Sequence, residues 1–142
     1  MSFQWLQMRI AEETDRRQRE AAILAQLPRV LTEVHTALVA CVADYVKVFG
    51  AESVEISFHS QKISVTVREQ QDARWEKIAK VEITAVPKLH GIHIDRNGEP
   101  LEIEVGLLPG EKIFYKHVEE FLTMEELTRR ILDRAFFPKL GE

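Results

Sequence analysis

The chain has 142 residues, of which 45% are hydrophobic and 30% are charged. This size and composition are typical of one folded domain that needs no metal or disulfide to build its core. A formal net charge of −4 argues against nucleic acid and against an anionic membrane surface as partners, because both attract basic proteins. The single cysteine, Cys41, excludes an internal disulfide and any zinc site built from cysteine pairs.

No apolar run reaches the length needed to span a bilayer, and residues 1–5 lack the basic and apolar segments of a signal peptide. We therefore expect a cytoplasmic protein. The chain also lacks the glycine-rich phosphate loop, the His-Glu-x-x-His helix and the Gly-x-Ser-x-Gly turn of several enzyme families. The sequence accordingly predicts neither a cofactor nor a metal ion, although an active site assembled from distant residues would show no such motif.

Residues 1–26 are predicted to be a peripheral helical arm. Its arginines, including Arg16 and Arg17, stand at helical spacing from acidic residues, which is typical of a solvated face and not of a phosphate-binding patch. The apolar stripe of this arm is narrow, and Trp5 and Met8 point away from it. One face of one helix cannot bury both sets, so we expect Trp5 and Met8 to contact another chain.

Residues 28–49 are predicted to form the central helix. Apolar residues fall at helical spacing along a broad stripe, which indicates a helix that lies on a core. Pro28 is favoured in a first turn and Gly50 just after a last turn, so we place the ends of the helix there. Cys41 lies in the apolar stripe and is expected to be a buried small hydrophobe, while His35 lies at its edge.

Residues 53–116 alternate apolar and polar side chains, which predicts antiparallel strands with one buried face. The pattern gives strands near residues 54–59, 63–68, 81–85, 90–95, 101–105 and 112–116, with a helical turn at residues 75–78. Asn97-Gly98 is a strong hairpin signal between two of these strands. Residues 123–137 follow a capping box, Thr123 to Glu126, and form a C-terminal helix. The aromatic pair Phe136-Phe137 and Leu140 are expected to dock on the core.

The element order predicts a single α+β domain over residues 1–142. Its centre is an antiparallel β-meander of about five to six strands. One face of the sheet is packed by the long N-terminal helical segment and by the C-terminal helix. The other face is polar, and it is either solvated or a binding surface.

The polar face carries the weak candidates for a chemical site. His93 and Asp95 share one face of a predicted strand, so they form either a metal-binding or general-base pair, or an exposed polar pair in which Asp95 caps the hairpin. If strand order brings His59, His93 and His117 together, they form a catalytic or metal centre, with Tyr115 as a ligand-binding neighbour. If it does not, these histidines are ordinary solvated side chains.

Two functions remain open. The first is a non-catalytic cytoplasmic interaction or assembly module that acts as a homodimer or other homo-oligomer, with a further protein as an additional candidate partner. The second is a small-molecule-binding protein or enzyme with a pocket between sheet and helices, using the histidines of the polar sheet face. The sequence does not decide whether the protein is an enzyme.

Overall fold

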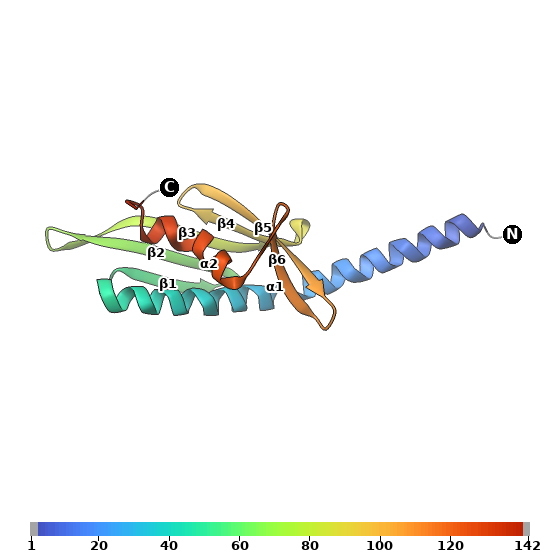
Figure 1. The fold of residues 1–142 in the computed structure, drawn as a ribbon, viewed down its shortest axis with the longest axis horizontal. Coiled ribbons are helices and arrows are strands. Elements are labelled where there is room, and N and C mark those ends of the chain that lie inside the picture. Colours follow the sequence, from blue (N-terminus) through green and yellow to red (C-terminus); the bar gives the residue numbers. More distant parts are fainter. Residues whose placement is uncertain (1–2, 141–142) are drawn as a thin grey trace.

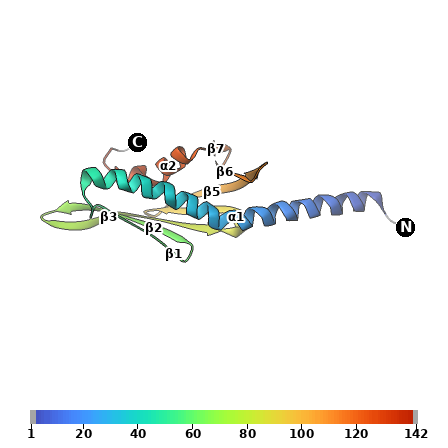
Figure 2. The same cartoon turned by 90° about the horizontal axis from the view of Figure 1, so that it is seen from below.

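A computed structural model describes residues 3–140. It shows the predicted α+β architecture, in which two helices lie on one face of an open antiparallel sheet (Figure 1, Figure 2). The sheet has seven strands, which is more than the five to six that the sequence predicts. Among the residues described, no helix is both long and apolar enough to cross a bilayer.

The elements follow the chain in a simple order. Each strand pairs antiparallel with the next one in sequence, so the sheet is a meander from β1 to β7. The elements are α1 (Gln4–Phe49), β1 (Val54–His59), β2 (Lys62–Gln71), β3 (Arg74–Val86), the short 3-10 helix η1 (Pro87–Leu89), β4 (Gly91–Arg96), β5 (Glu99–Leu108), β6 (Lys112–His117), β7 (Glu120–Leu122) and α2 (Met124–Phe136).

The N-terminal helix corrects one prediction. In place of an arm and a separate central helix, residues 4–49 form one helix of 46 residues with Pro28 inside it. A proline removes one main-chain hydrogen bond, which here is the bond to the carbonyl of Leu24. Burial on either side holds the helix together, since Leu27 is 4% exposed and Val30 is fully buried. The helix bends where its packed half meets its free half, and it ends as predicted before Gly50, whose φ is 106° (Figure 2).

Two strand predictions are also wrong. Residues 75–78 are not a helical turn, because β3 begins at Arg74 and forms a long hairpin with β2. The turn is made by Asp72 and Ala73, both with positive φ. The alternating pattern is lost there because the end of the hairpin extends beyond the core, so its side chains need not be apolar on either face. The second error is that the sequence predicts no strand after residue 116, whereas the structure has β7. This strand has only three residues, which is too short for a periodic signal.

The core lies between the sheet and both helices. The inward-facing residues of the strands are those that the alternation predicts, and the packed half of α1 and the apolar side of α2 cover them (Figure 2). The capping box of α2 is present, with the Thr123 hydroxyl accepting from the Glu126 amide at 3.1 Å and the Glu126 carboxylate accepting from the Thr123 amide at 3.1 Å. Within residues 3–140, no helix covers the opposite face of the sheet.

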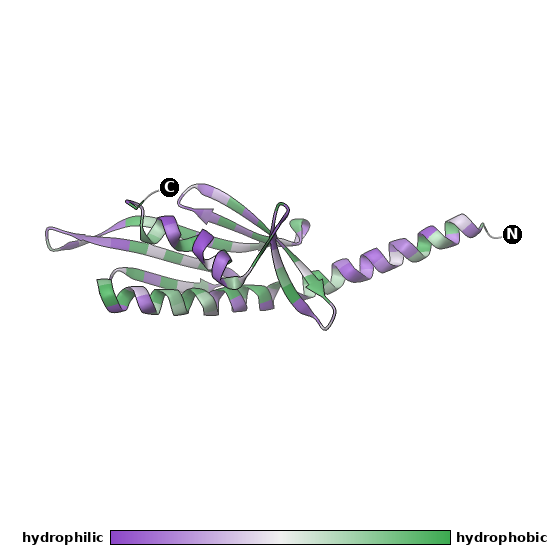
Figure 3. Ribbon diagram, viewed as in Figure 1, coloured by the Kyte–Doolittle hydropathy of each residue, from purple (hydrophilic) through white to green (hydrophobic). Residues whose placement is uncertain are grey.

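The arm formed by the first half of α1 projects from this body (Figure 1). Side chains from Phe3 to Arg19 are exposed or nearly so, and the first fully packed residue of the helix is Leu27. Figure 3 shows a mostly hydrophilic arm whose outer end is more hydrophobic. Hydrogen bonds from Arg16 and Arg17 hold the pKa of the Glu13 carboxyl at about 2, so the predicted pairing within the arm is confirmed.

The position of Pro28 predicts a stabilised variant. Pro28→Ala restores a helix-interior amide donor, and we expect this to raise the free energy of unfolding by about 1–3 kcal/mol. The higher conformational entropy of the unfolded alanine variant offsets part of that gain. Urea unfolding followed by circular dichroism measures the change. Pro87→Ala is the matched control, because Pro87 begins a three-residue helix and blocks no interior bond. A lower stability for Pro28→Ala than for the unaltered chain would contradict the account given above.

Candidate functional site

The structure places the predicted histidines apart. His59 and His93 stand in one row across the polar face, in register through Lys62 and Thr84. Three strand spacings separate them, which is about 14 Å. His117 belongs to the other face, where its Nδ1 lies 3.1 Å from a guanidinium nitrogen of Arg130 on α2. The three side chains therefore do not meet at a common point.

The other two candidates have local structural partners. Asp95 accepts a hydrogen bond from the Gly98 amide at 2.7 Å, as expected for a residue that caps the β4–β5 hairpin. Tyr115 lies on the core face, on the same side of β6 as His117 and away from His59 and His93. It is 5% exposed, and its hydroxyl donates to the Glu33 carboxylate at 3.2 Å. His93 has the Glu102 carboxylate as its partner on the neighbouring strand.

No group of three or more histidine, cysteine, aspartate or glutamate side chains within the described part of the chain is arranged to hold a metal ion. Cys41 is only partly buried, whereas the sequence predicts full burial. His35 lies at the edge of the core, as predicted, with its ring 5.0 Å from that of Phe58.

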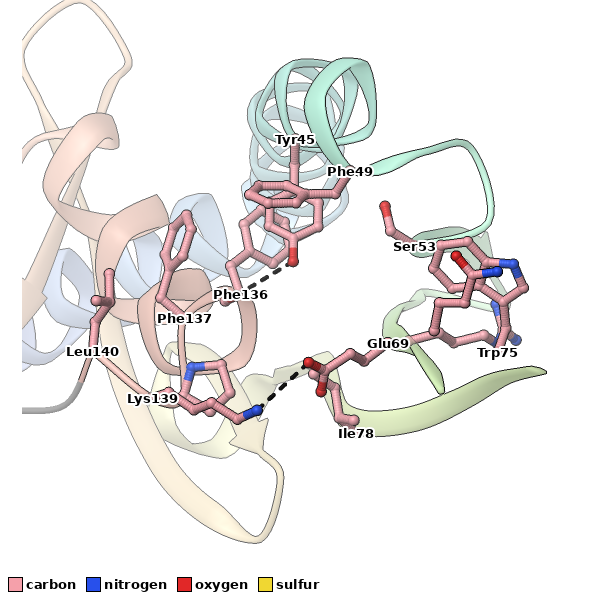
Figure 4. Close-up of a pocket in the computed structure, with 13 residues that line it drawn as sticks. Tyr45, Phe49, Ser53, Glu69, Trp75, Ile78, Phe136, Phe137, Lys139 and Leu140 are labelled. Carbon is pink, nitrogen blue, oxygen red and sulfur yellow. Dashed lines mark hydrogen bonds and ion pairs between the residues drawn. The ribbon is translucent and has the colours of Figure 1, made fainter. Parts of the chain in front are cut away.

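An aromatic cleft lies at the end of the molecule opposite the arm (Figure 4). Its volume is about 370 Å³, within the usual range for small-ligand sites. Tyr45 and Phe49 come from the last turns of α1, Phe136 and Phe137 from the end of α2, and Trp75 from the start of β3.

The aromatic wall is tightly packed. The Tyr45 ring lies 4.5 Å from that of Phe49 and 4.3 Å from that of Phe136. Figure 4 shows these rings grouped on one side of the cleft, with Trp75 across the opening. Tyr45 and Phe49 are one helical turn apart, so the same helix period that directs Tyr45 to α2 directs Phe49 there too. Phe136 is buried as predicted, whereas Phe137 is 39% and Leu140 is 78% exposed.

The charged groups of the cleft are paired. The Glu69 carboxylate lies 3.5 Å from the Lys139 ammonium (Figure 4), and Arg68 donates to Glu55 at 3.1 Å. Burial, with a smaller contribution from the Glu69 charge, raises the pKa of the Tyr45 hydroxyl. Ser53 is almost fully buried, and its hydroxyl donates to the Gly50 carbonyl at 2.6 Å. Such a surface is suited to holding an apolar or aromatic group.

A wider groove adjoins the cleft. It runs between α1 and α2, has a volume of about 700 Å³, and shares Tyr45, Phe49, Phe136 and Phe137 with the cleft. We call this surface the α1–α2 groove. Sequence reasoning missed both surfaces, because residues 45–49, 75 and 136–140 meet only when α1, β3 and α2 are packed. The sequence signal that could have indicated these surfaces was the set of aromatic residues near the C-terminal ends of both helices.

The residues predicted to contact a partner lie at the far end of the arm. Trp5 is 66% and Met8 is 59% exposed. Phe3, Leu6 and Ile10 are exposed as well, so residues 3–10 present large apolar side chains on two sides of the helix. We call these residues the arm tip.

Comparison of this chain with protein-family models, with curated proteins and with solved structures finds no match.

The two tyrosines predict a measurable dependence on pH. Burial is the main cause that raises the pKa of both hydroxyls above the ordinary value of 10, and more so for Tyr115, which also faces the Glu33 carboxylate. The pKa of each hydroxyl is higher in the folded state than in the unfolded state, so the protonated tyrosines add to the free energy of unfolding. This contribution is fully present below pH 10 and is lost as the pH rises beyond it. We expect Tyr115 to ionise after Tyr45.

Absorbance titration of tyrosinate in Tyr45→Phe and Tyr115→Phe assigns the two steps, because each variant keeps one tyrosine. Ionisation of the remaining Tyr115 at the ordinary pKa, in protein that circular dichroism shows to be folded, would contradict its placement in the core.

Proposed function

We propose that this protein is a non-catalytic interaction and assembly module that acts as a homodimer through its N-terminal arm. The observation that carries the proposal is the arm tip. Five large apolar side chains of residues 3–10 are between 43% and 66% exposed: Phe3, Trp5, Leu6, Met8 and Ile10.

An apolar stripe on a helix usually faces a packing partner, and the arm tip carries two such stripes. Full burial of one such side chain contributes roughly 1.5–3 kcal/mol, so burial of several against a partner offers a substantial driving force. Within the described chain, the arm tip makes no contact with the sheet or α2. The ion pairs near the tip are local, and the arm is tied to the body only farther along, where the Glu20 carboxylate lies 3.1 Å from Nε2 of His90. A second protein surface is the simplest way to remove these side chains from water. A cytoplasmic location remains part of the proposal.

A small-molecule-binding role at the aromatic cleft is the second candidate. The volume of the cleft and its five aromatic side chains favour it. The histidines of the polar sheet face do not contribute, because none of them lines this cleft.

Deletion of residues 1–20 tests the first proposal. We expect the full-length chain to have the mass of a dimer in light scattering and the shortened chain to have the mass of a folded monomer. The body should keep its fold, since the buried residues of α1 begin at Leu27.

The double variant Trp5→Ser/Met8→Ser is the finer test, with Gln7→Ser/Gln18→Ser as a control on the same arm. We expect a dimer dissociation constant at least about tenfold higher for the first variant only. An unchanged oligomeric state after the deletion would refute a role for the arm in assembly.

A further inference from the structure

The α1–α2 groove is apolar along its floor and open to solvent. Val48 at its edge is 74% exposed and Phe49 is 51% exposed. Leu132, Phe136 and Phe137 supply the facing wall from α2. The two ends of α1 therefore carry the largest exposed apolar surfaces of that helix, the arm tip at one end and the groove at the other.

The charges of these two surfaces are complementary. The groove is lined by four carboxylates and one guanidinium: Asp44, Glu125, Glu126, Asp133 and Arg129. Residues 3–11 carry one charged side chain, Arg9. Arg9 pairs with Glu12 at 2.8 Å, but both side chains are largely exposed, so this ion pair adds little stability. Arg9 can therefore leave Glu12 and pair with a carboxylate of the groove.

The arm cannot reach the groove of its own chain. Residues 8 and 48 belong to one continuous helix, and 40 residues of helix span about 60 Å. Any arm tip that occupies the groove therefore comes from another molecule.

The surface between the two ends allows a second helix to lie alongside. From Val34 to Ala43, α1 carries no charged residue. Its exposed side chains there are small or apolar: Thr36, Val39, Ala40 and Ala43. The Thr36 hydroxyl donates to the Thr32 carbonyl at 2.9 Å, so it already has a hydrogen-bond partner. An arm packed here would desolvate no charged side chain of residues 34–43, and charged side chains of the arm such as Arg16 and Glu20 pair with one another within the arm.

We propose that the arm tip of a second copy of this chain occupies the α1–α2 groove, and that the exchange is reciprocal. The two α1 helices run antiparallel about a two-fold axis near Gln26 and Leu27, the middle of α1. Each arm then lies along the packed half of the partner's α1. A two-fold arrangement is closed, so it gives a dimer and not a fibre. This inference rests on the proposed function and names the surface that receives the arm.

The contact area of this arrangement is sufficient for a stable dimer. An arm segment of about 20 residues is about 30 Å long, and a helix is about 10 Å wide. The dimer has two arm contacts, and each contact buries one strip of this size on the arm and one on the partner. The four strips give a total buried area of about 1,200 Å², which is the lower end of the range for stable interfaces. The aromatic side chains of the tip add to this area when they enter the groove.

A spin label tests the arrangement directly. The label is placed at Lys47→Cys in a Cys41→Ser background, because Lys47 is exposed beside the groove and does not line it. The measured signals are the indole N–H resonances of the two tryptophans. Trp75 lies near Gly50, so the label on the same chain broadens its signal and provides a positive control.

Trp5 lies about 60 Å from residue 47 along the same helix. Its signal broadens only if the arm reaches the labelled end of a partner molecule. We expect strong broadening of Trp5 that disappears when the nitroxide is reduced.

Two exposed valines give matched variants. Val48→Glu introduces a charge at the edge of the groove, and Val118→Glu introduces one in the β6–β7 turn; the two side chains are 74% and 75% exposed, so neither change disturbs the core. We expect the dimer dissociation constant to rise at least about tenfold for Val48→Glu and to stay unchanged for Val118→Glu.

The outcomes separate this inference from the proposed function. A dimer in light scattering with a sharp Trp5 signal, as arm-to-arm pairing would give, overturns the groove as the docking surface and leaves the arm as an assembly element. A dimer that Val48→Glu does not weaken overturns the groove as well. A monomer at every concentration, including one whose groove binds a small molecule, overturns both proposals.

Discussion

Burial of the second half of α1 against the sheet is the interaction on which the rest of the structure depends. Leu31, Val34 and Leu38 are completely buried there, and they form the apolar layer on which the inward-facing strand residues and α2 pack. This burial keeps the helix continuous through Pro28, because the apolar contacts on either side outweigh the loss of one main-chain hydrogen bond. It also gives the arm its direction, since a continuous helix must leave the sheet where its packed face ends.

The same packing creates the concave surfaces. The last turns of α1 and the end of α2 meet above the β2–β3 hairpin, so aromatic residues distant in sequence line one cleft and one groove. Their rings pack against one another in tilted and edge-to-face pairs and leave the outer sides of Phe49 and Phe137 open to solvent. The concave surface of this protein is thus a consequence of how its two helices end, and it lies on the helical side of the sheet.

The uncovered face of the sheet has a different character. Its charged side chains are matched across neighbouring strands, as with Lys62 and Glu82 or His93 and Glu102. Cross-strand pairs of this kind stabilise a solvated sheet face and satisfy the histidine that the sequence made a candidate. His93 and His117 therefore have structural partners, whereas the arm tip and the α1–α2 groove expose large apolar side chains.

Strong periodicity and capping signals made several elements predictable from the amino-acid sequence. The alternation of strand residues, the Asn97-Gly98 hairpin and the Thr123 capping box each depend on neighbours in the chain, so they are visible without the fold. The exposure of Trp5 and Met8 was also predictable, because one helix face cannot hide two apolar stripes. The tertiary structure decided the rest. It made one helix out of two, since only packing compensates for Pro28, and it extended β3 through residues that show no alternation. It separated His59, His93 and His117, because the position of a side chain in a sheet depends on strand order and register, which are non-local. It also assembled the cleft from residues more than 90 positions apart, for the same physical reason: contacts between distant segments are fixed by the packing of whole elements, and no local pattern encodes them.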